Sequence, residues 1–470
     1  MKTLMKISIS LCLMLLSCAP SYSHSAELAD KYWNAALELE QQGKYLEAAQ
    51  MYAKSARAEM ESPRPRLKDL GVTLSDAGYC YNKAGQYEQA LKYYEQALAI
   101  ARKLGQEDKI AIRLNKIGTV YNAWGQYDQT LKYYEQALAI DRKLGREDGI
   151  AMCLSNIGSV YNVRGQYDQA LKYYEQALAI GRKLGREGDV ARDLNNIGNV
   201  YYAWGQYDQA LKYYEQALAI GRKLGREGDV ARDLNNIGLV YDAWGQYDQA
   251  LKYHEQALAI NRKLGREGDI AMCLSNIGNV YYAWGQYDRA IKYYKQALAI
   301  VRKSGQEDQI APYLSNIGAV YDAWGQYDQA LKYHEQALAI DRKLGRKGEI
   351  ARDLNNIGGV YYELKEYTKA IENLENSIDK KEKLRKTAVG DIRRDYLDSQ
   401  IYTYQFLTSA SIRSKDFSRA FNSIELSRAK LLAEKLARSE SAMSIPSVER
   451  IQNELPDNTA LLVYANAIWK

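Results

Sequence analysis

The chain has 470 residues, with 64 lysines and arginines against 58 aspartates and glutamates, so its formal charge at pH 7 is +6. This near balance excludes the strongly basic stripe that is typical of nucleic-acid-binding proteins. The 41 tyrosines against 3 phenylalanines indicate that one tyrosine-rich segment has been multiplied, and a repeat array of that kind needs no single closed core.

The first predicted element is a secretory signal at residues 1–26. Lys2 and Lys6 precede an apolar stretch from Ile7 to Leu16, which is the pattern of an export signal and is too short for a membrane-spanning helix. The sequence Leu-Leu-Ser-Cys that ends at Cys18 resembles a bacterial lipobox, in which the cysteine is lipidated. The alternative is ordinary cleavage near residues 23–26. We therefore expect an exported protein, either periplasmic or attached to the membrane through an N-terminal lipid only.

Residues 27–62 predict a degenerate repeat that caps the N-terminal end of the array. Ala36 stands where the repeating unit has a glycine. The residues that keep the spacing of the unit are Gly43, Tyr45, Ala48 and Tyr52. Pro63 and Pro65 break the chain before the array proper, which we place at residues 67–380.

The array consists of a forty-residue unit in about eight copies. Residues 189–228 and 229–268 differ at only four positions, which are Asn199/Leu239, Tyr202/Asp242, Tyr214/His254 and Gly221/Asn261. The glycine of the unit recurs at Gly78, Gly118, Gly158, Gly198, Gly238, Gly278, Gly318 and Gly358. A fixed period of this length is the signature of stacked-repeat proteins.

Each unit predicts two helices. Asp189 is a candidate N-cap for a first helix over 190–204, a tight turn follows at 205–207, and a second helix covers 208–224 with Gly225 at the C-terminal cap. Gly198 lies inside the first helix, where glycine costs about 1 kcal/mol relative to alanine. This cost in every unit indicates a close approach of the two helices, with Ala210 and Ala217 as the small residues that face it.

The unit resembles the tetratricopeptide repeat family. The residues on that family's signature spacing are Leu194, Gly198, Tyr201, Gly205, Tyr207, Ala210, Tyr214 and Ala217. The unit is longer than the common form, with Arg222 in place of the usual proline, and is similar to the longer repeats of kinesin light chains and cell-polarity scaffolds. The resemblance implies an all-α fold, a right-handed α-solenoid of stacked antiparallel helix pairs, with a concave groove for a protein or peptide ligand.

Beyond the array, residues 381–440 predict a degenerate helical repeat and a connecting helix, and the basic run Lys380–Lys386 predicts a solvated helix end. Residues 441–470 add a short amphipathic helix, a turn and an apolar strand at Thr459–Tyr464. The stretch from Ser427 to Ala467 resembles the entry to a CHAT domain, a caspase-like peptidase module. We therefore expect 441–470 to be the start of a truncated α/β domain of that kind. The family's catalytic histidine and cysteine have no counterpart here.

Catalytic, metal and cofactor sites are not predicted. The histidines are His24, beside the leader, and His254 and His334, which replace Tyr214 at the equivalent core position and have no second ligand at metal-binding spacing. Cys153 and Cys273 share one repeat position and predict buried helix residues. No phosphate-binding glycine loop occurs.

The candidate site is the face of the first helices that the resemblance places in the groove. Arg192, Asn195, Asn199 and Tyr202 share one helix face, and Asn196 belongs to a ladder that includes Asn156. The other candidate residues are Arg232, Asn235, Asn236, Asn276, Asn316 and Asn356. An amide can both donate and accept, so the ladder suits an extended peptide backbone. The alternative is that these amides form hydrogen bonds between repeats.

Two functions from different classes remain open at this point. The leading hypothesis is an exported, non-enzymatic scaffold that binds a protein or peptide. The alternative is the sensor half of a CHAT-type peptidase whose catalytic module is missing from this chain. A third hypothesis is a scaffold that associates with itself, because near-identical repeats can stack on, or exchange with, those of a second copy.

Overall fold

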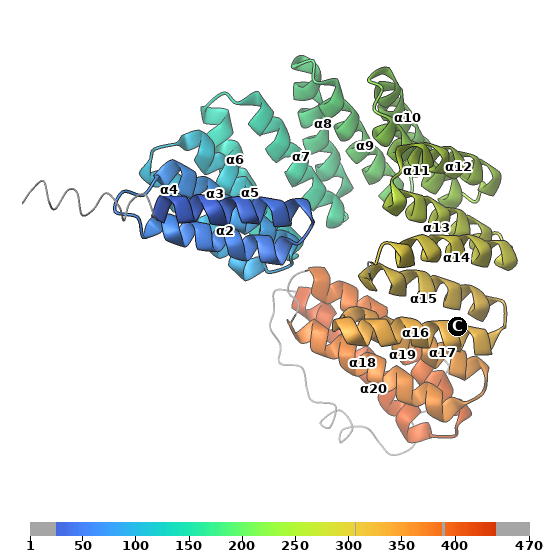
Figure 1. The fold of residues 1–470 in the computed structure, drawn as a ribbon. Coiled ribbons are helices and arrows are strands. Elements are labelled where there is room, and N and C mark those ends of the chain that lie inside the picture. The colour runs from blue at the N-terminus through green and yellow to red at the C-terminus, as the bar shows by residue number, and fades with distance from the viewer. Residues whose placement is uncertain (1–24, 306, 388–390, 439–470) are drawn as a thin grey trace, which may run out of the picture. The chain divides into compact units, whose positions relative to one another are not determined.

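The computed structural model describes residues 25–305, 307–387 and 391–438, and these residues form helices joined by short turns (Figure 1). The predicted leader with Cys18 and the CHAT-like segment 441–470 lie outside the described residues. None of the helices in the described ranges combines the length and the apolar character needed to cross a lipid bilayer.

The helices of the array follow the forty-residue period. The first helices are α3 (Leu67–Lys83), α5 (Glu107–Ala123), α7 (Glu147–Val163), α9 (Glu187–Ala203), α11 (Glu227–Ala243), α13 (Glu267–Ala283), α15 (Glu307–Ala323) and α17 (Lys347–Glu363). The second helices are α4 (Tyr87–Lys103), α6 (Tyr127–Lys143), α8 (Tyr167–Lys183), α10 (Tyr207–Lys223), α12 (Tyr247–Leu264), α14 (Tyr287–Lys303), α16 (Tyr327–Leu344) and α18 (Tyr367–Thr387). The predicted all-α arrangement of stacked helix pairs is confirmed for the described residues.

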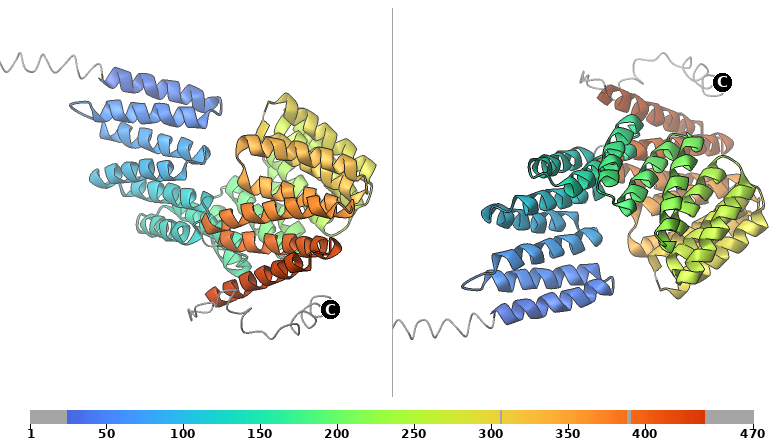
Figure 2. Two further views of the ribbon diagram at one scale, coloured as in Figure 1. Left: turned by 90° about the horizontal axis from the view of Figure 1, so that it is seen from below. Right: turned by 90° about the horizontal axis from the view of Figure 1, so that it is seen from above.

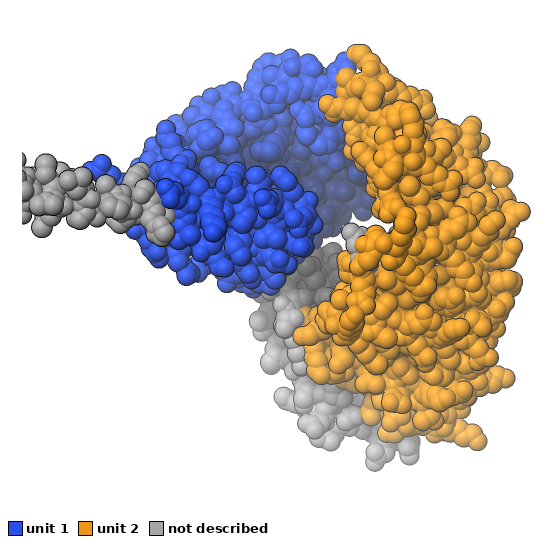
Figure 3. Space-filling model, viewed as in Figure 1, with its two compact units in different colours: residues 1–209 blue, residues 210–470 orange. Residues whose placement is uncertain are grey.

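The chain divides into two compact units, residues 1–209 and 210–470 (Figure 3). In unit 1 the pairs α3–α4, α5–α6 and α7–α8 pack along their lengths, and each second helix also contacts the next first helix. Figure 2 shows the blue helices of this unit side by side in both views. In unit 2 the pairs from α11–α12 to α17–α18 pack in the same way.

The helix ends differ from the predicted caps in one respect. Asp189 is not the N-cap of α9, because the helix begins at Glu187 after Arg186, whose side chain makes no capping hydrogen bond. Asp189 lies in the first turn, where its charge is favourable, and forms an ion pair with Arg192. The predicted C-terminal cap is confirmed at Gly225, which has φ +64°.

Close helix packing at the repeated glycines is confirmed. A Cβ atom on Gly278 would lie 3.0 Å from the ring of Tyr294, and one on Gly118 would lie 2.6 Å from the ring of Tyr134. Both tyrosines are buried. The glycine of the first helix therefore makes room for the large side chain sixteen residues later on the second helix, at Gly78, Gly118, Gly158, Gly238, Gly278, Gly318 and Gly358.

An ion pair also joins the two ends of many helix pairs. Glu107 at the start of α5 lies 2.7 Å from the Nζ of Lys143 at the end of α6. The same contact recurs in Glu147–Lys183, Glu227–Lys263, Glu267–Lys303 and Glu307–Lys343. These side chains are largely exposed, so each contact contributes little by itself.

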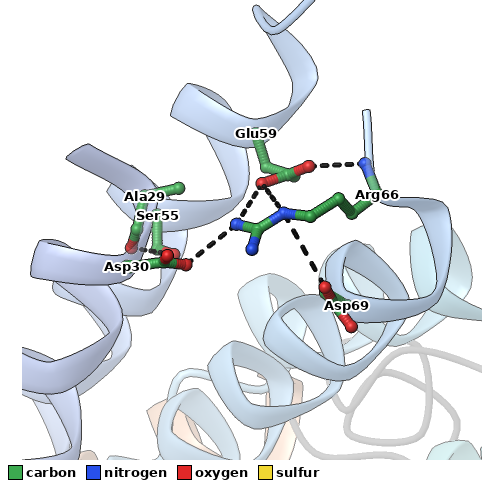
Figure 4. A network of polar contacts seen from close by, with 6 residues as sticks. All are labelled: Ala29, Asp30, Ser55, Glu59, Arg66 and Asp69. Carbon is green, nitrogen blue, oxygen red and sulfur yellow. Dashed lines mark hydrogen bonds and ion pairs between the residues drawn. The ribbon is translucent and has the colours of Figure 1, made fainter. Parts of the chain in front are cut away.

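The degenerate N-terminal pair consists of a helix at residues 25–41 and α2 (Tyr45–Met60). Arg66, at the start of α3, holds this pair to the array (Figure 4). Its Nη2 atom lies 2.8 Å from both Glu59 Oε2 and Asp30 Oδ1. Ser55 Oγ also donates a hydrogen bond to the carbonyl of Ala29 across the pair.

The C-terminal pair consists of α19 (Asp391–Arg413) and α20 (Phe417–Arg438). α19 packs on α18 through Leu374, Leu407 and Ala410. The prediction that Lys380–Lys386 is solvated is wrong at Lys381. This lysine is buried, and its Nζ donates a hydrogen bond to Thr403 Oγ1 at 3.0 Å. Burial lowers the pKa of Lys381 to about 8.

Two adjacent glycines of α17 test the packing argument. A Cβ on Gly358 would meet Leu374 at 2.7 Å, whereas one on Gly359 would meet nothing within 4 Å. We expect Gly358→Ala to destabilise the protein by about 1–3 kcal/mol and Gly359→Ala to be neutral or to stabilise it by up to about 1 kcal/mol. Thermal melts of both variants measure the difference, and equal melting temperatures would contradict the close approach.

Candidate functional site

We call the exposed sides of the first helices within each compact unit the first-helix face. Successive first helices contact one another there, α3 with α5, α5 with α7 and α7 with α9 in unit 1, and α11 with α13 and α15 with α17 in unit 2. Side chains at corresponding positions of successive repeats therefore line up along this face.

Four of the predicted site residues lie on this face. Arg192 and Arg232 are exposed, and each pairs with an aspartate one turn earlier, at 2.9 Å and 3.0 Å. Asn199 is exposed, and the half-buried ring of Tyr202 lies 6.1 Å from that of Tyr207.

Asn195 and Asn235 lie deeper than the shared-face prediction implies, since each is only 5% exposed. Asn195 Nδ2 donates to the carbonyl of Ala191 in its own helix. Asn235 Oδ1 accepts from His254 Nδ1 at 2.9 Å and from Asn276 Nδ2 at 2.9 Å. The reason is that a first helix packs on its second helix and on the neighbouring first helices, so its buried stripe is wider than periodicity alone suggests.

The asparagine ladder makes hydrogen bonds between repeats at two places. Asn156 Nδ2 donates to Asn115 Oδ1 at 3.2 Å, and Asn276 makes the equivalent bond to Asn235. These are bonds of the kind that the alternative interpretation requires. Asn196, Asn236, Asn316 and Asn356 occupy the corresponding positions and are half-buried.

A second set of polar contacts between repeats was not predicted. Ser155 Oγ donates to Asp193 Oδ1 at 2.8 Å, and Ser315 Oγ donates to Asp353 Oδ1 at 2.9 Å. Both aspartates are completely buried. Burial, opposed by the serine hydrogen bond, raises the pKa of Asp193 to about 6. The sequence signal was a polar residue one turn before each repeated glycine, such as Ser155 before Gly158.

A pocket of about 750 Å³ opens where α11 begins, α12 ends and α13 begins. Two predicted site residues, Arg232 and Asn235, line it. The lining residues that the sequence argument missed include Arg226, Glu227, Asp229, Asn261, Arg266, Asp269 and Met272. One signal was available for them, because Gly221/Asn261 is among the four differences between the twin repeats.

Asn261 supplies a buried amide to this pocket. It is 4% exposed, and its Nδ2 lies 3.5 Å from Cys273 Sγ while its Oδ1 has no hydrogen-bond partner among the described residues. If the side-chain amide of Asn261 is flipped, so that its nitrogen and oxygen exchange places, Nδ2 becomes the atom without a hydrogen-bond partner. In either orientation, one polar atom at this pocket remains to be satisfied.

The histidines and cysteines of the array lie in the core. His254 and His334 are at most 1% exposed, and burial lowers the pKa of each to about 4, so both are neutral at pH 7. Cys153 and Cys273 are buried and free, as predicted. Within the described ranges, no three His, Cys, Asp or Glu side chains are placed to hold a metal ion.

The tryptophans that follow the first helices pack on tyrosines of the preceding repeat. Trp204 lies 5.5 Å from Tyr167, and Trp284 lies 5.6 Å from Tyr247. Both indoles remain 39% exposed. They serve mainly to join neighbouring repeats.

The comparisons with known proteins agree with this architecture. The tetratricopeptide repeat family model matches seven overlapping segments that together cover residues 27–343. No curated protein gives a significant match to the sequence.

Several solved structures are similar to parts of the chain. BtubC from P. vanneervenii is 25% identical over 47% of this chain and 92% of its own, with a TM-score of 0.42. Kinesin light chain repeats from Podosopora anserina are 25% identical over 43% and 100%, with a TM-score of 0.37. Aspartyl phosphate phosphatase F from Bacillus subtilis is 15% identical over 75% and 93%, with a TM-score of 0.47. With scores below 0.5, these similarities carry no argument about function.

The hydrogen bonds of Asn235 generate a stability prediction. Asn235→Ala leaves His254 and Asn276 without an acceptor, so we expect a loss of about 1–3 kcal/mol. Asn316→Ala is the matched control, because the structure shows no side-chain hydrogen bond for this half-buried residue, and we expect a change below about 0.5 kcal/mol. Urea titrations measure both. Equal losses would mean that the Asn235 bonds contribute no stability.

Proposed function

The chain belongs to the tetratricopeptide repeat family, and from this premise we propose that it is an exported scaffold that binds a protein or peptide ligand on the first-helix face. The observation that carries the proposal is the pocket at the start of α11 and α13, which contains Arg232 and Asn235. Its volume of about 750 Å³ is on the scale of ligand pockets, roughly 300–1,000 Å³.

The pocket chemistry suits a segment of polypeptide. Arg226 and Arg232 form ion pairs with Asp229, and Arg266 forms one with Asp269. All five line the pocket, and Met272 adds an apolar side chain. The amide of Asn261 can accept from or donate to a ligand backbone. An extended peptide presents alternating donors and acceptors, which fits this mixture better than a purely apolar or a singly charged small molecule does.

Variation along the face supports a role in ligand preference. The position of Arg192 is held by Met152, Arg232, Met272, Pro312 and Arg352 in other repeats. The position of Tyr202 is held by Asn162, Asp242, Tyr282, Asp322 and Tyr362. The ladder position, by contrast, is asparagine in all six repeats from Asn156 to Asn356. We therefore assign ligand preference to the variable positions and geometry to the asparagines.

The repeat fold is typically non-catalytic. The alternative of a peptidase sensor depends on residues 441–470, which lie outside the described residues.

A photo-crosslinking amino acid at position 272 tests the proposed surface. In the full chain, we expect Met272 replaced by benzoyl-phenylalanine to give a discrete crosslinked partner in extracts of the source cell. The same replacement of Lys252, exposed on α12, is the control and should give none. Arg232→Ala should lower the yield about tenfold, because a hydrogen bond to a charged group is worth about 1.5–3 kcal/mol. Equal labelling from both positions would remove the support for this surface.

Export and lipidation have a separate test. The apolar stretch before Cys18 leads us to propose a lipid-modified N-terminus. We expect Cys18→Ser to abolish acyl labelling and to move the protein from the membrane fraction to the soluble fraction. Labelling that persists in the variant, or a wild-type protein that is already soluble, would refute the lipid anchor.

A further inference from the structure

Each junction between helix pairs brings a residue near the end of a second helix toward the residue twelve positions later on the next first helix. Cys153 Sγ lies 3.9 Å from Asp141 Oδ2, and Asn261 Nδ2 lies 3.5 Å from Cys273 Sγ. The residues at the corresponding junctions are Ala101/Arg113, Asp141/Cys153, Gly181/Asp193, Gly221/Asp233, Asn261/Cys273, Val301/Tyr313 and Asp341/Asp353. Among these junctions, the last places an acid on both sides.

Asp341 on α16 and Asp353 on α17 are both completely buried. Asp341 Oδ1 accepts from Arg346 Nε at 2.6 Å, and Asp353 Oδ1 accepts from Ser315 Oγ at 2.9 Å. The two aspartates occupy the two positions whose side chains approach to 3.9 Å and 3.5 Å at the α6–α7 and α12–α13 junctions, so the repeat geometry places the two carboxyl groups beside each other. The Oδ2 atom of each has no hydrogen-bond donor in the part of the chain that the structure describes.

The charges around the pair leave one carboxylate without a close counter-ion. Arg346, which precedes α17, contacts Asp341. Arg352 is half-exposed beside Asp353 and pairs with Glu349 at 2.6 Å. On α16, His334 is neutral above about pH 4. On α18, Lys381 donates to Thr403.

We propose that Asp341 and Asp353 share one proton across their two unpartnered oxygens, so that the junction of α16 with α17 is a pH-sensitive joint. Two facing buried carboxyls cannot both ionise without strong repulsion. One proton between them supplies the donor that both oxygens lack. Loss of that proton weakens the junction and loosens α17, together with the pairs that follow it, from α15 and α16.

The sign of the pH dependence follows from linkage. Burial, reinforced by the carboxyl of Asp341 and opposed by the Ser315 hydrogen bond, raises the pKa of Asp353 to about 7. Because the folded junction binds the proton more tightly than the unfolded chain does, its stability is complete below the ordinary carboxyl pKa of about 4. This stability is then lost as the pH rises through about 7.

The junction of α6 with α7 is a control within the same molecule. Asp141 is buried there and lies 3.6 Å from Arg146, the equivalent of Arg346. The facing residue is Cys153, and burial raises its pKa to about 12. This junction therefore has the same arginine and the same first carboxylate but no second buried carboxylate. Burial raises the pKa of Asp141, and the acid on α7 that adds to this rise, Asp148, is exposed.

Hydrogen exchange of the full chain at pH 5.0 and pH 7.5, corrected for intrinsic rates, tests the joint. We expect the protection of α16 and α17 amides to fall at least about tenfold between these pH values, and that of α6 and α7 to fall less than threefold. Asp353→Asn keeps the shape and the acceptor for Ser315 but needs no proton, so its α16 and α17 protection should also fall less than threefold. Asp353→Cys, which copies the α6–α7 junction, should behave in the same way.

An equal loss of protection in the wild type and in Asp353→Asn would overturn the proposal, as would a wild-type α16–α17 junction no more sensitive than α6–α7. If circular dichroism shows that Asp353→Asn does not fold, the same hydrogen-exchange comparison is made on Asp341→Asn. A loss of α16 and α17 protection equal to that of the wild type would again overturn the proposal. These outcomes depend on no ligand, so they stand apart from the success or failure of the proposed binding surface.

Discussion

The fold of this chain depends on glycine, the residue without a side chain, at one position of the first helices. In the helix pairs of the array that lie within one compact unit, the first helix has a glycine where a large side chain of the second helix must lie, and even a methyl group there would come within about 3 Å of it. The second-helix side chain is usually tyrosine, but histidine stands at His254 and His334 and leucine at Leu374. The substitutions show that the contact needs bulk. The ring of His254 pairs with the buried amide of Asn235, whereas Nδ1 of His334 has no hydrogen-bond partner among the described residues.

Once each pair is formed, specific polar bonds set how it stacks on the next. The bonds from Asn156 and Ser155 reach the preceding and following repeats, respectively, and the first is partly buried and the second buried. The exposed residues of the first-helix face are therefore free to vary without disturbing the stack. This separation explains how the near-identical repeats 189–228 and 229–268 can differ at Asn199 and Tyr202 while keeping one geometry.

The forty-residue period was sufficient to predict the helix pairs, the turns and the close glycine contact, because these follow from local periodicity. The period did not predict where α9 begins, how deeply side chains are buried by neighbouring helices, or which residues form the pocket. Asp189 was a plausible cap by residue type, but the helix extends to Glu187. Asn195 shares a helix face with Arg192, yet the adjacent helices bury it. The pocket was also out of reach, since it combines Arg232 with Asn261 of the following second helix and Met272 of the next repeat.

The Glu–Lys contacts that close many pairs bear on how the array would come apart. The unfolding of a linear array is governed by the stability of each pair and by the coupling between neighbours. Contacts such as Glu107–Lys143 join the start and end of one pair and are exposed, so added salt screens them. The bonds between pairs, such as Ser155–Asp193, are buried and are screened much less. High ionic strength should therefore lower the stability of single pairs more than their coupling, and the array should melt in longer cooperative blocks.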